Sequence, residues 1–340
     1  MKKAFCLLLL LLIFGKSFSQ LSDWEIVPVS FKMSYKLKGP LKSITEYNYG
    51  YENDSLELIN KKATVYDRQG CVTSSSYHYI PNNKMWYSSI YSNTYDEKGD
   101  LIEQISYTLT DDTMRDTNTY FYSYDVDRYL VKDSFFQEGY HVKILYEYGA
   151  QKKLIKGEEW NFKHNTFEAN YFLYDSLGRL CKGEAYEDSV LTREARYTYD
   201  SNNNLITINN TFFADGQVYE KEDWFYKYDG KNNCVEWVIF EDGEQYSKQI
   251  NKYNEWNQIV EYMEFWSDTA CASIAFLEYD SKGNRIIEKE EDLRNKSISV
   301  CTSKYDSYGN LIEQMSKIRY ADSSEERISR YTIRQIEYYE

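Results

Sequence analysis

Adjacent carboxylates are the residues of this sequence whose type and spacing could most directly do chemistry. The 340-residue chain carries 54 Asp and Glu residues, among them Glu158–Glu159 and Glu290–Glu291–Asp292. Two carboxyl groups at a suitable separation are sufficient to hydrolyse a glycosidic bond. Because so many acids also form close pairs by chance, we expect no enzyme and assign no catalytic residue. Glycoside hydrolysis is a remote alternative.

Other catalytic or cofactor-binding signatures are absent from the sequence. The three histidines, His78, His141 and His164, lie far apart and show no metal-ligand spacing such as HExxH. No nucleophile elbow, phosphate-binding loop or dinucleotide fingerprint occurs. We therefore expect neither a cofactor nor a metal site, and we interpret the histidines as isolated polar residues of strands or loops.

Aromatic side chains offer a different chemistry, which is the stacking of planar rings on sugars. The sequence has 36 Tyr and 7 Trp residues, and such rings serve either as ligand platforms or as cross-strand ladders of a sheet. The candidate ligand contacts are Trp256, Trp160, Lys152 and Lys153, because they lie at a turn tip or where the repeated pattern of the chain is interrupted. These residues favour a glycan or a protein as the ligand.

A repeat organises the chain and must position these residues. Ten tyrosines recur at intervals of 24 to 29 residues, and Asp directly follows eight of them. Gly or Asn stands four residues after the tyrosine in eight of the ten units, and Val, Leu or Ile stands six residues after it in eight. The ten are Tyr66, Tyr95, Tyr124, Tyr148, Tyr174, Tyr199, Tyr228, Tyr253, Tyr279 and Tyr305.

Each part of the repeated phrase has a structural role in a β-hairpin. The tyrosine ends a strand, where its ring packs on a half-buried pleated surface. The following Asp accepts backbone N–H groups in an Asx-turn, and Gly or Asn adopts the left-handed conformation that a short loop requires. The aliphatic residue then begins the return strand. We therefore interpret these aspartates as turn formers rather than as calcium ligands.

Two strands and two turns in each unit predict an all-β fold, an antiparallel meander of about ten hairpin repeats. Aromatics twelve residues after and two residues before the key tyrosine share strand parity, so we expect them to lie side by side as ladders. Aliphatic residues at neighbouring positions, such as Leu101 and Ile102, give both faces an apolar row near the turn. We therefore expect a long, strongly twisted or spiralling sheet that partly covers its second face.

The repeated phrase resembles the YD repeats of the RHS family. The similarity is clearest in "YTYDSNNNLI" (197–206), "FLYDSLGRL" (172–180) and "YDSYGNLI" (305–312). The resemblance implies spiralling β-sheets like those of bacterial toxin shells and animal adhesion receptors, and it transfers no catalytic residue. The expected function is an exported scaffold or binding module at the cell envelope or outside the cell. A relative or fragment of an RHS-type toxin-delivery shell is the alternative, although the sequence lacks the Asp-Pro of the family's self-cleavage segment.

The ends of the chain and its charge set the expected location. "MKKAFCLLLLLLIFGKSFSQ" predicts a signal peptide over 1–19, followed by opening hairpins over 20–65, repeats over 66–330 and a closing half-repeat strand over 331–340. We expect a periplasmic or extracellular protein without a membrane span. The formal charge of −14, or −17 without the three lysines of the signal peptide, argues against nucleic acid as a partner. Of the six cysteines, Cys6 lies in the predicted signal peptide. The other five have no CxxC spacing and predict no disulfide framework: Cys71, Cys181, Cys234, Cys271 and Cys301.

Overall fold

The computed structural model describes residues 39–52, 55–80, 87–110, 113–137, 139–149, 152–267 and 270–340. Over these ranges the chain forms 22 β-strands and no helix. The predicted all-β class and the antiparallel hairpins are confirmed. The predicted signal peptide (1–19) and the first part of the segment 20–65 lie outside the described residues. No helix in the described part of the chain has the length and apolar character needed to cross a membrane.

The strands form two compact units. Unit 1 comprises residues 146–158 and 167–251, and unit 2 comprises the described residues of 39–145, 159–166 and 252–340. The strands mainly in unit 1 are β9 (Leu154–Asn161), β10 (Thr166–Tyr174), β11 (Leu180–Glu187), β12 (Val190–Tyr199), β13 (Leu205–Ala214), β14 (Gln217–Tyr228), β15 (Cys234–Glu241) and β16 (Glu244–Tyr253). The strands mainly in unit 2 are β1 (Leu41–Glu52), β2 (Ser55–Tyr66), β3 (Val72–Tyr79), β4 (Tyr87–Tyr95), β5 (Leu101–Thr110), β6 (Thr113–Tyr124), β7 (Leu130–Gln137), β8 (Tyr140–Tyr148), β17 (Ile259–Trp266), β18 (Cys271–Tyr279), β19 (Arg285–Asp292), β20 (Ser297–Tyr305), β21 (Leu311–Tyr320) and β22 (Arg327–Tyr338).

The acidic side chain of the repeated phrase closes the YD turn, as the sequence predicts. In the β12–β13 turn, Asp200 Oδ1 accepts the backbone N–H of Asn202 at 2.9 Å and that of Asn204 at 2.8 Å. Asn203 has a left-handed φ of 64°, and Gly178 has a φ of 74° at the equivalent place of the β10–β11 turn. The phrase is therefore a turn-forming sequence in both of these hairpins.

A hydrogen bond from the key tyrosine ties one hairpin to the hairpin before it. The hydroxyl of Tyr199, at the end of β12, donates to the backbone carbonyl of Leu180, where β11 begins. Because a half-buried carbonyl needs a partner, the tyrosine has a polar role as well as a packing role. The same bond recurs at 2.7 to 2.9 Å in both units, as Tyr95–Val72, Tyr124–Leu101, Tyr174–Leu154, Tyr228–Leu205, Tyr279–Ile259 and Tyr305–Arg285.

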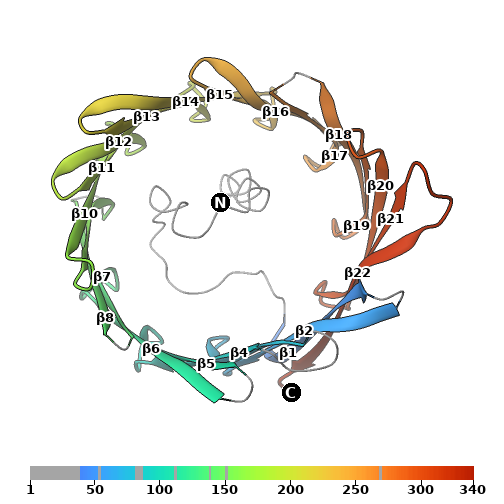
Figure 1. The fold of residues 1–340 in the computed structure, drawn as a ribbon, viewed down its shortest axis with the longest axis horizontal. Helices are drawn as coiled ribbons and strands as arrows, with labels where there is room; N and C mark the ends of the chain where they lie inside the picture. Colours follow the sequence, from blue (N-terminus) through green and yellow to red (C-terminus); the bar gives the residue numbers. More distant parts are fainter. Residues whose placement is uncertain are drawn as a thin grey trace. The chain divides into compact units, whose positions relative to one another are not determined.

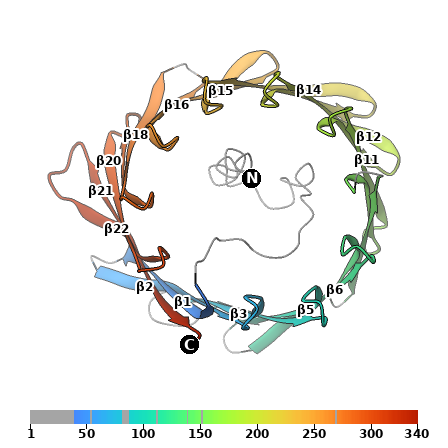
Figure 2. The ribbon, with the colours of Figure 1, turned by 180° about the vertical axis from the view of Figure 1, so that it is seen from behind.

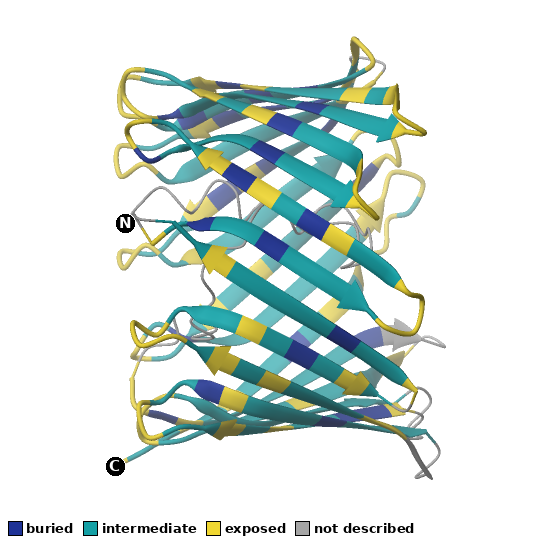
Figure 3. Cartoon of the chain, turned by 90° about the vertical axis from the view of Figure 1, so that its left-hand side faces the viewer, coloured by how far each residue is buried: buried dark blue, intermediate teal, exposed yellow. Residues whose placement is uncertain are grey.

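Most strand residues are half-buried, and fully buried positions are scattered along the strands (Figure 3). In unit 1 a buried cluster joins β14 and β15 through Tyr226, Trp237 and Ile239, among others. In unit 2 the neighbours Leu101 and Ile102 point to opposite faces; Leu101 is 3% exposed but Ile102 is 37% exposed. The expected cover over the second apolar row is therefore missing at this position.

The first and last strands are hydrogen-bonded neighbours. β22 pairs antiparallel with β21 on one side and with β1 on the other, with Ile44 opposite Ile336. Both views show β22 beside β1 within unit 2 (Figure 1, Figure 2), and Arg334 Nε donates to Glu46 Oε2 at 2.6 Å across this seam. The first and last strands of the chain are therefore paired within unit 2. The predicted long, strongly twisted or spiralling sheet needs a correction here, because β1 and β22 are paired and so satisfy the two edges that a spiral would leave exposed.

Candidate functional site

Three perpendicular aromatic pairs occupy equivalent positions of the repeat. In each pair one ring lies three residues before a key tyrosine and the other lies twelve residues after it, on the next strand. Ring pairs of this geometry are favourable because the edge of one ring meets the face of the other. The pairs are Phe121–Phe136, Tyr171–Tyr186 and Phe225–Phe240, with centroids 5.6 to 5.9 Å apart and interplanar angles of 72° to 90°.

These ladders differ by one position from the predicted ones. The sequence pattern places Tyr186 beside Phe172, but the ring that contacts Tyr186 is that of Tyr171. The register between β10 and β11 shifts between Leu173 and Tyr174 at the turn. This irregularity is a β-bulge, and one extra residue inverts the face that all later residues of the strand share. The predicted partner was wrong for that reason.

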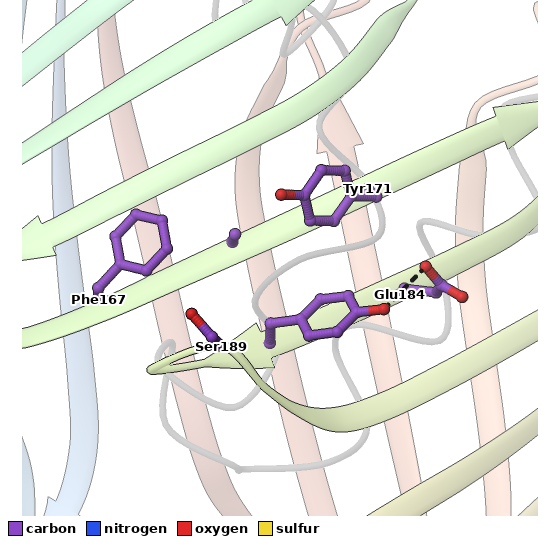
Figure 4. A pocket seen from close by; sticks show the side chains of 6 residues that line it. Phe167, Tyr171, Glu184 and Ser189 are labelled. Atoms are coloured by element: carbon purple, nitrogen blue, oxygen red, sulfur yellow. Dashed lines mark hydrogen bonds between the residues drawn. The ribbon is translucent and has the colours of Figure 1, made fainter.

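A shallow hollow of about 380 Å³ lies beside the tyrosine pair of β10 and β11 (Figure 4). Ala169 is 2% exposed and lies opposite Tyr186 in the ladder between these strands. The equivalent positions of the other two aromatic pairs carry the larger Thr119 and Asp223. The small side chain of Ala169 therefore leaves space between the rings. The hollow is lined by Phe167, Ala169, Tyr171, Glu184, Tyr186 and Ser189.

The β11–β12 turn forms the rim of the hollow in a strained conformation. Ser189 has a φ of 71°, in the left-handed region that residues other than Gly rarely adopt. The equivalent hairpin turns carry Gly216, with a φ of 73°, and Gly243, with a φ of 85°. Asp188 holds the rim in place, since its N–H donates to Phe167 O at 2.7 Å and its Oδ1 accepts the Phe167 N–H at 3.0 Å. Strained residues cluster at functional sites, and Ser189 shares its left-handed conformation with Lys152 and Lys296.

The polar groups beside the hollow form a connected network. Glu184 accepts Lys182 Nζ at 2.6 Å and the hydroxyl of Tyr186 at 3.2 Å, and the second contact is drawn in Figure 4. Lys182 also contacts Glu194 Oε2 at 2.8 Å. Burial raises the pKa of Tyr186, so its hydroxyl keeps its proton at neutral pH. The Lys156 ammonium lies 5.4 Å from the ring centre of Tyr171.

None of the four predicted ligand contacts lines this hollow. Lys152 is an exposed turn residue with a left-handed φ of 56°. Lys153 donates to the backbone carbonyl of Gly178, and its ammonium lies 5.0 Å from the ring centre of Tyr174. Their role in binding stays a prediction.

The two predicted tryptophans differ in how accessible they are. Trp160 is half-buried, with the Lys143 ammonium 5.6 Å from its ring centre. Trp256 lies in the β16–β17 turn, is 71% exposed and donates its backbone N–H to Asn254 Oδ1.

Sequence reasoning did not identify the hollow. The position of Ala169 varies among the units, with Ile90 and Thr119 at equivalent places, so it gave no signal. Ser189 stands where two other turns carry Gly and could have indicated the site.

The acidic pairs of the sequence are separated by strand geometry. Glu290 and Glu291 are neighbours in β19 and therefore point to opposite faces. Glu290 shares its face with Glu264 of β17, since their partners in β18 are Ala275 and Ser273, two residues apart. Burial raises the pKa of both Glu264 and Glu290, and the Glu290 charge adds to the shift at Glu264. Among the described residues, no group of three or more His, Cys, Asp or Glu side chains could hold a metal ion.

The fold and site define a β-hairpin repeat protein with an aromatic-walled surface hollow. No protein-family model and no curated protein matches the chain. Its structure is similar to the crystal structure of TcdB2-TccC3 without the hypervariable C-terminal region, at 13% identity over 80% of this chain and 17% of that chain, with a TM-score of 0.33. It is also similar to the Photorhabdus luminescens Tc holotoxin pore, at 14% identity over 78% of this chain and 18% of that chain, with a TM-score of 0.29.

A third similar structure is a porin-like protein from Bacteroides uniformis, at 10% identity over 88% of this chain and 98% of that chain, with a TM-score of 0.32. The chain spans less than a fifth of the length of the two Tc toxin chains. Similarity at these identities and scores carries no argument about function. The resemblance to YD repeats therefore continues to depend on the sequence motifs.

Proposed function

We propose that this protein is an exported, non-enzymatic β-repeat scaffold that binds a carbohydrate in the hollow between β10 and β11. The observation that carries the proposal is the small Ala169 beside two perpendicular tyrosine rings. Sugars combine apolar C–H faces, which stack on aromatic rings, with hydroxyl groups that need polar partners. The hollow offers both, in the rings of Tyr171 and Tyr186 and in the oxygens of Glu184 and Ser189.

The size and shape of the hollow support this ligand class. Its volume of about 380 Å³ lies in the range of roughly 300 to 1,000 Å³ that small-molecule sites occupy. The hollow is shallow, which suits a short stretch of a longer glycan better than a fully enclosed small molecule. The small Ala169 and the strained Ser189 both line this one hollow.

Calorimetric titration of residues 20–340 with a panel of oligosaccharides tests the proposal. Ala169→Thr places the side chain of the equivalent position 119 in the hollow, and Tyr171→Ala removes one wall. Each change is expected to weaken binding by at least about tenfold, the factor that about 1.4 kcal/mol represents. Phe225→Ala is the matched control, because it removes the equivalent ring of another pair in unit 1.

Two results would overturn the proposal. One is that no oligosaccharide binds; the other is that Phe225→Ala weakens binding as much as Tyr171→Ala does. The unfolding midpoint of each variant separates a lost contact from a lost fold. If no sugar binds, the alternative of an RHS-type shell relative is tested by co-purification of a partner half-shell from the native source, and a protein ligand is tested by the same experiment.

A further inference from the structure

We infer that the hollow selects a neutral carbohydrate over an anionic one, through Glu184 and Ser189; this inference rests on the proposed binding function. The starting observation is that Glu184, a carboxylate, lies in the lining with no cation lining the hollow beside it. A uronate or sulfate group placed there would meet a negative charge. A neutral sugar would instead present hydroxyl groups that a carboxylate accepts well.

The nearby cations are already bound to carboxylates. Lys182 contacts Glu184 at 2.6 Å and Glu194 at 2.8 Å, and Arg196 contacts Glu194 at 2.7 Å. These two cations and two carboxylates cancel in formal charge. Recruiting either cation to an anionic ligand would break an existing ion pair, in a protein whose formal charge is −14.

Lys156, the remaining cation near the tyrosine walls, is engaged in the same way. Its ammonium contacts Glu158 Oε1 at 2.5 Å while lying 5.4 Å from the ring centre of Tyr171. The Lys156 side chain is therefore paired with Glu158 and lies over the ring of Tyr171. It completes the wall rather than offering an unneutralised charge to a ligand.

The remaining hydrogen-bonding capacity matches hydroxyl groups. A carboxylate has about four lone-pair positions, and Glu184 uses its two oxygens for Lys182 and Tyr186, one contact each. Ser189 adds a hydroxyl that can both donate and accept. Its left-handed φ of 71° is a position that Gly fills in two equivalent turns, so the serine side chain is retained at a cost to backbone stability.

Ser189→Gly separates a binding role from a structural one because the two effects have opposite signs. The variant is expected to raise the midpoint of urea unfolding, since it relieves the left-handed conformation, and to weaken neutral-sugar binding by about fivefold or more. Lys296→Gly is the matched control: it relieves a φ of 50° at a hairpin turn of unit 2 and is expected to leave sugar binding unchanged.

The deciding measurement compares neutral gluco- and manno-oligosaccharides with uronic-acid oligosaccharides of equal length, at about 50 mM and about 500 mM NaCl. We expect the neutral series to bind at least about tenfold more tightly, with little dependence on salt. Tighter binding of the uronates, weakened by salt and lost in Tyr171→Ala, would overturn the neutral selectivity while leaving the proposed function standing. An unchanged neutral-sugar affinity in Ser189→Gly would remove Ser189 from the inference, and binding of neither series would overturn both proposals.

Discussion

The hydroxyl of Tyr199 lies 2.9 Å from the backbone carbonyl of Leu180, and this bond joins two successive repeats. The donor ends β12, and the acceptor begins β11 of the preceding unit. The same relationship between Tyr228 and Leu205 joins the next two units. A phenylalanine would fill the same space on the pleated surface but would leave the carbonyl without this donor. The recurring tyrosine is therefore a link between repeats and not only an element of packing.

Tyr199→Phe is expected to lower the free energy of unfolding by about 1 kcal/mol, because Leu180 O loses its donor. The midpoint of a urea titration should fall while its slope stays constant. Tyr246→Phe is the control, since the Tyr246 side chain is 41% exposed. If both changes lower the free energy of unfolding equally, the hydroxyl of Tyr199 contributes no more to stability than the hydroxyl of an exposed tyrosine.

The turn aspartate can be tested by two substitutions at one position. Asp200→Ala removes the acceptor of two backbone N–H groups and is expected to cost about 1 to 2 kcal/mol. Asp200→Asn loses the Asn204 Nδ2 contact to Oδ2 but keeps an acceptor for both N–H groups. It should therefore cost less than Asp200→Ala, because Asn254 already closes the β16–β17 turn in the same way. Thermal unfolding of both variants checks the order. A larger loss for Asn than for Ala would contradict the turn-forming role.

The hairpin unit could be predicted from the sequence because its determinants are local. Tyr199, Asp200 and Asn203 act within a few residues of one another, so a spacing pattern reveals them. The pairing of Ile44 with Ile336 could not be predicted, because the two residues are far apart in the sequence and no local spacing pattern reveals such a pairing.

The ladder partners show a second limit of sequence reasoning. Strand parity assigned Tyr186 to Phe172, but a bulge at the turn moved the contact to Tyr171. A pattern of period two cannot reveal an extra residue that the turn absorbs. The hollow could not be predicted for the same reason, since the role of Ala169 appears only when its cross-strand partner, Tyr186, is known.

Glu264→Gln is expected to stabilise the protein at pH 7. Burial and the neighbouring Glu290 raise the pKa of Glu264 above 4.5. Because the pKa of Glu264 is higher in the folded than in the unfolded state, protonation of Glu264 stabilises the fold. This contribution to the free energy of unfolding is fully present below about pH 4.5 and is lost as the pH rises through the folded-state pKa. The wild-type protein should therefore gain stability from pH 7 towards pH 5, and the Gln variant should gain less.

Urea titrations between pH 4 and pH 8 check this difference, which should shrink towards pH 4. The turn aspartates set the lowest pH at which the titrations are informative. Asp280 is an example, because hydrogen bonds from Asn284 lower its pKa below 3.8. Their stabilisation is present above about pH 3.8 and is lost as the pH falls through the folded value. Glu313→Gln is the control, since it removes a half-buried carboxylate that is paired with the exposed Lys304. A Glu264→Gln variant less stable than wild type at pH 7 would contradict the assigned burial cost.

Lys152→Gly tests whether the irregular 148–160 unit is under strain. Lys152 has a φ of 56°, where Gly178 has a φ of 74° in the next YD turn. A left-handed conformation costs a side-chain-bearing residue roughly 1 to 2 kcal/mol, so the variant is expected to raise the free energy of unfolding by about 1 kcal/mol. Gly149 leaves this turn without an acidic side chain, and its closure depends on the backbone bonds Gly149 N–Lys153 O and Lys152 N–Gly149 O, both 2.8 Å. Because glycine preserves both backbone bonds, a fall in stability would show that the Lys152 side chain contributes more than its conformation costs.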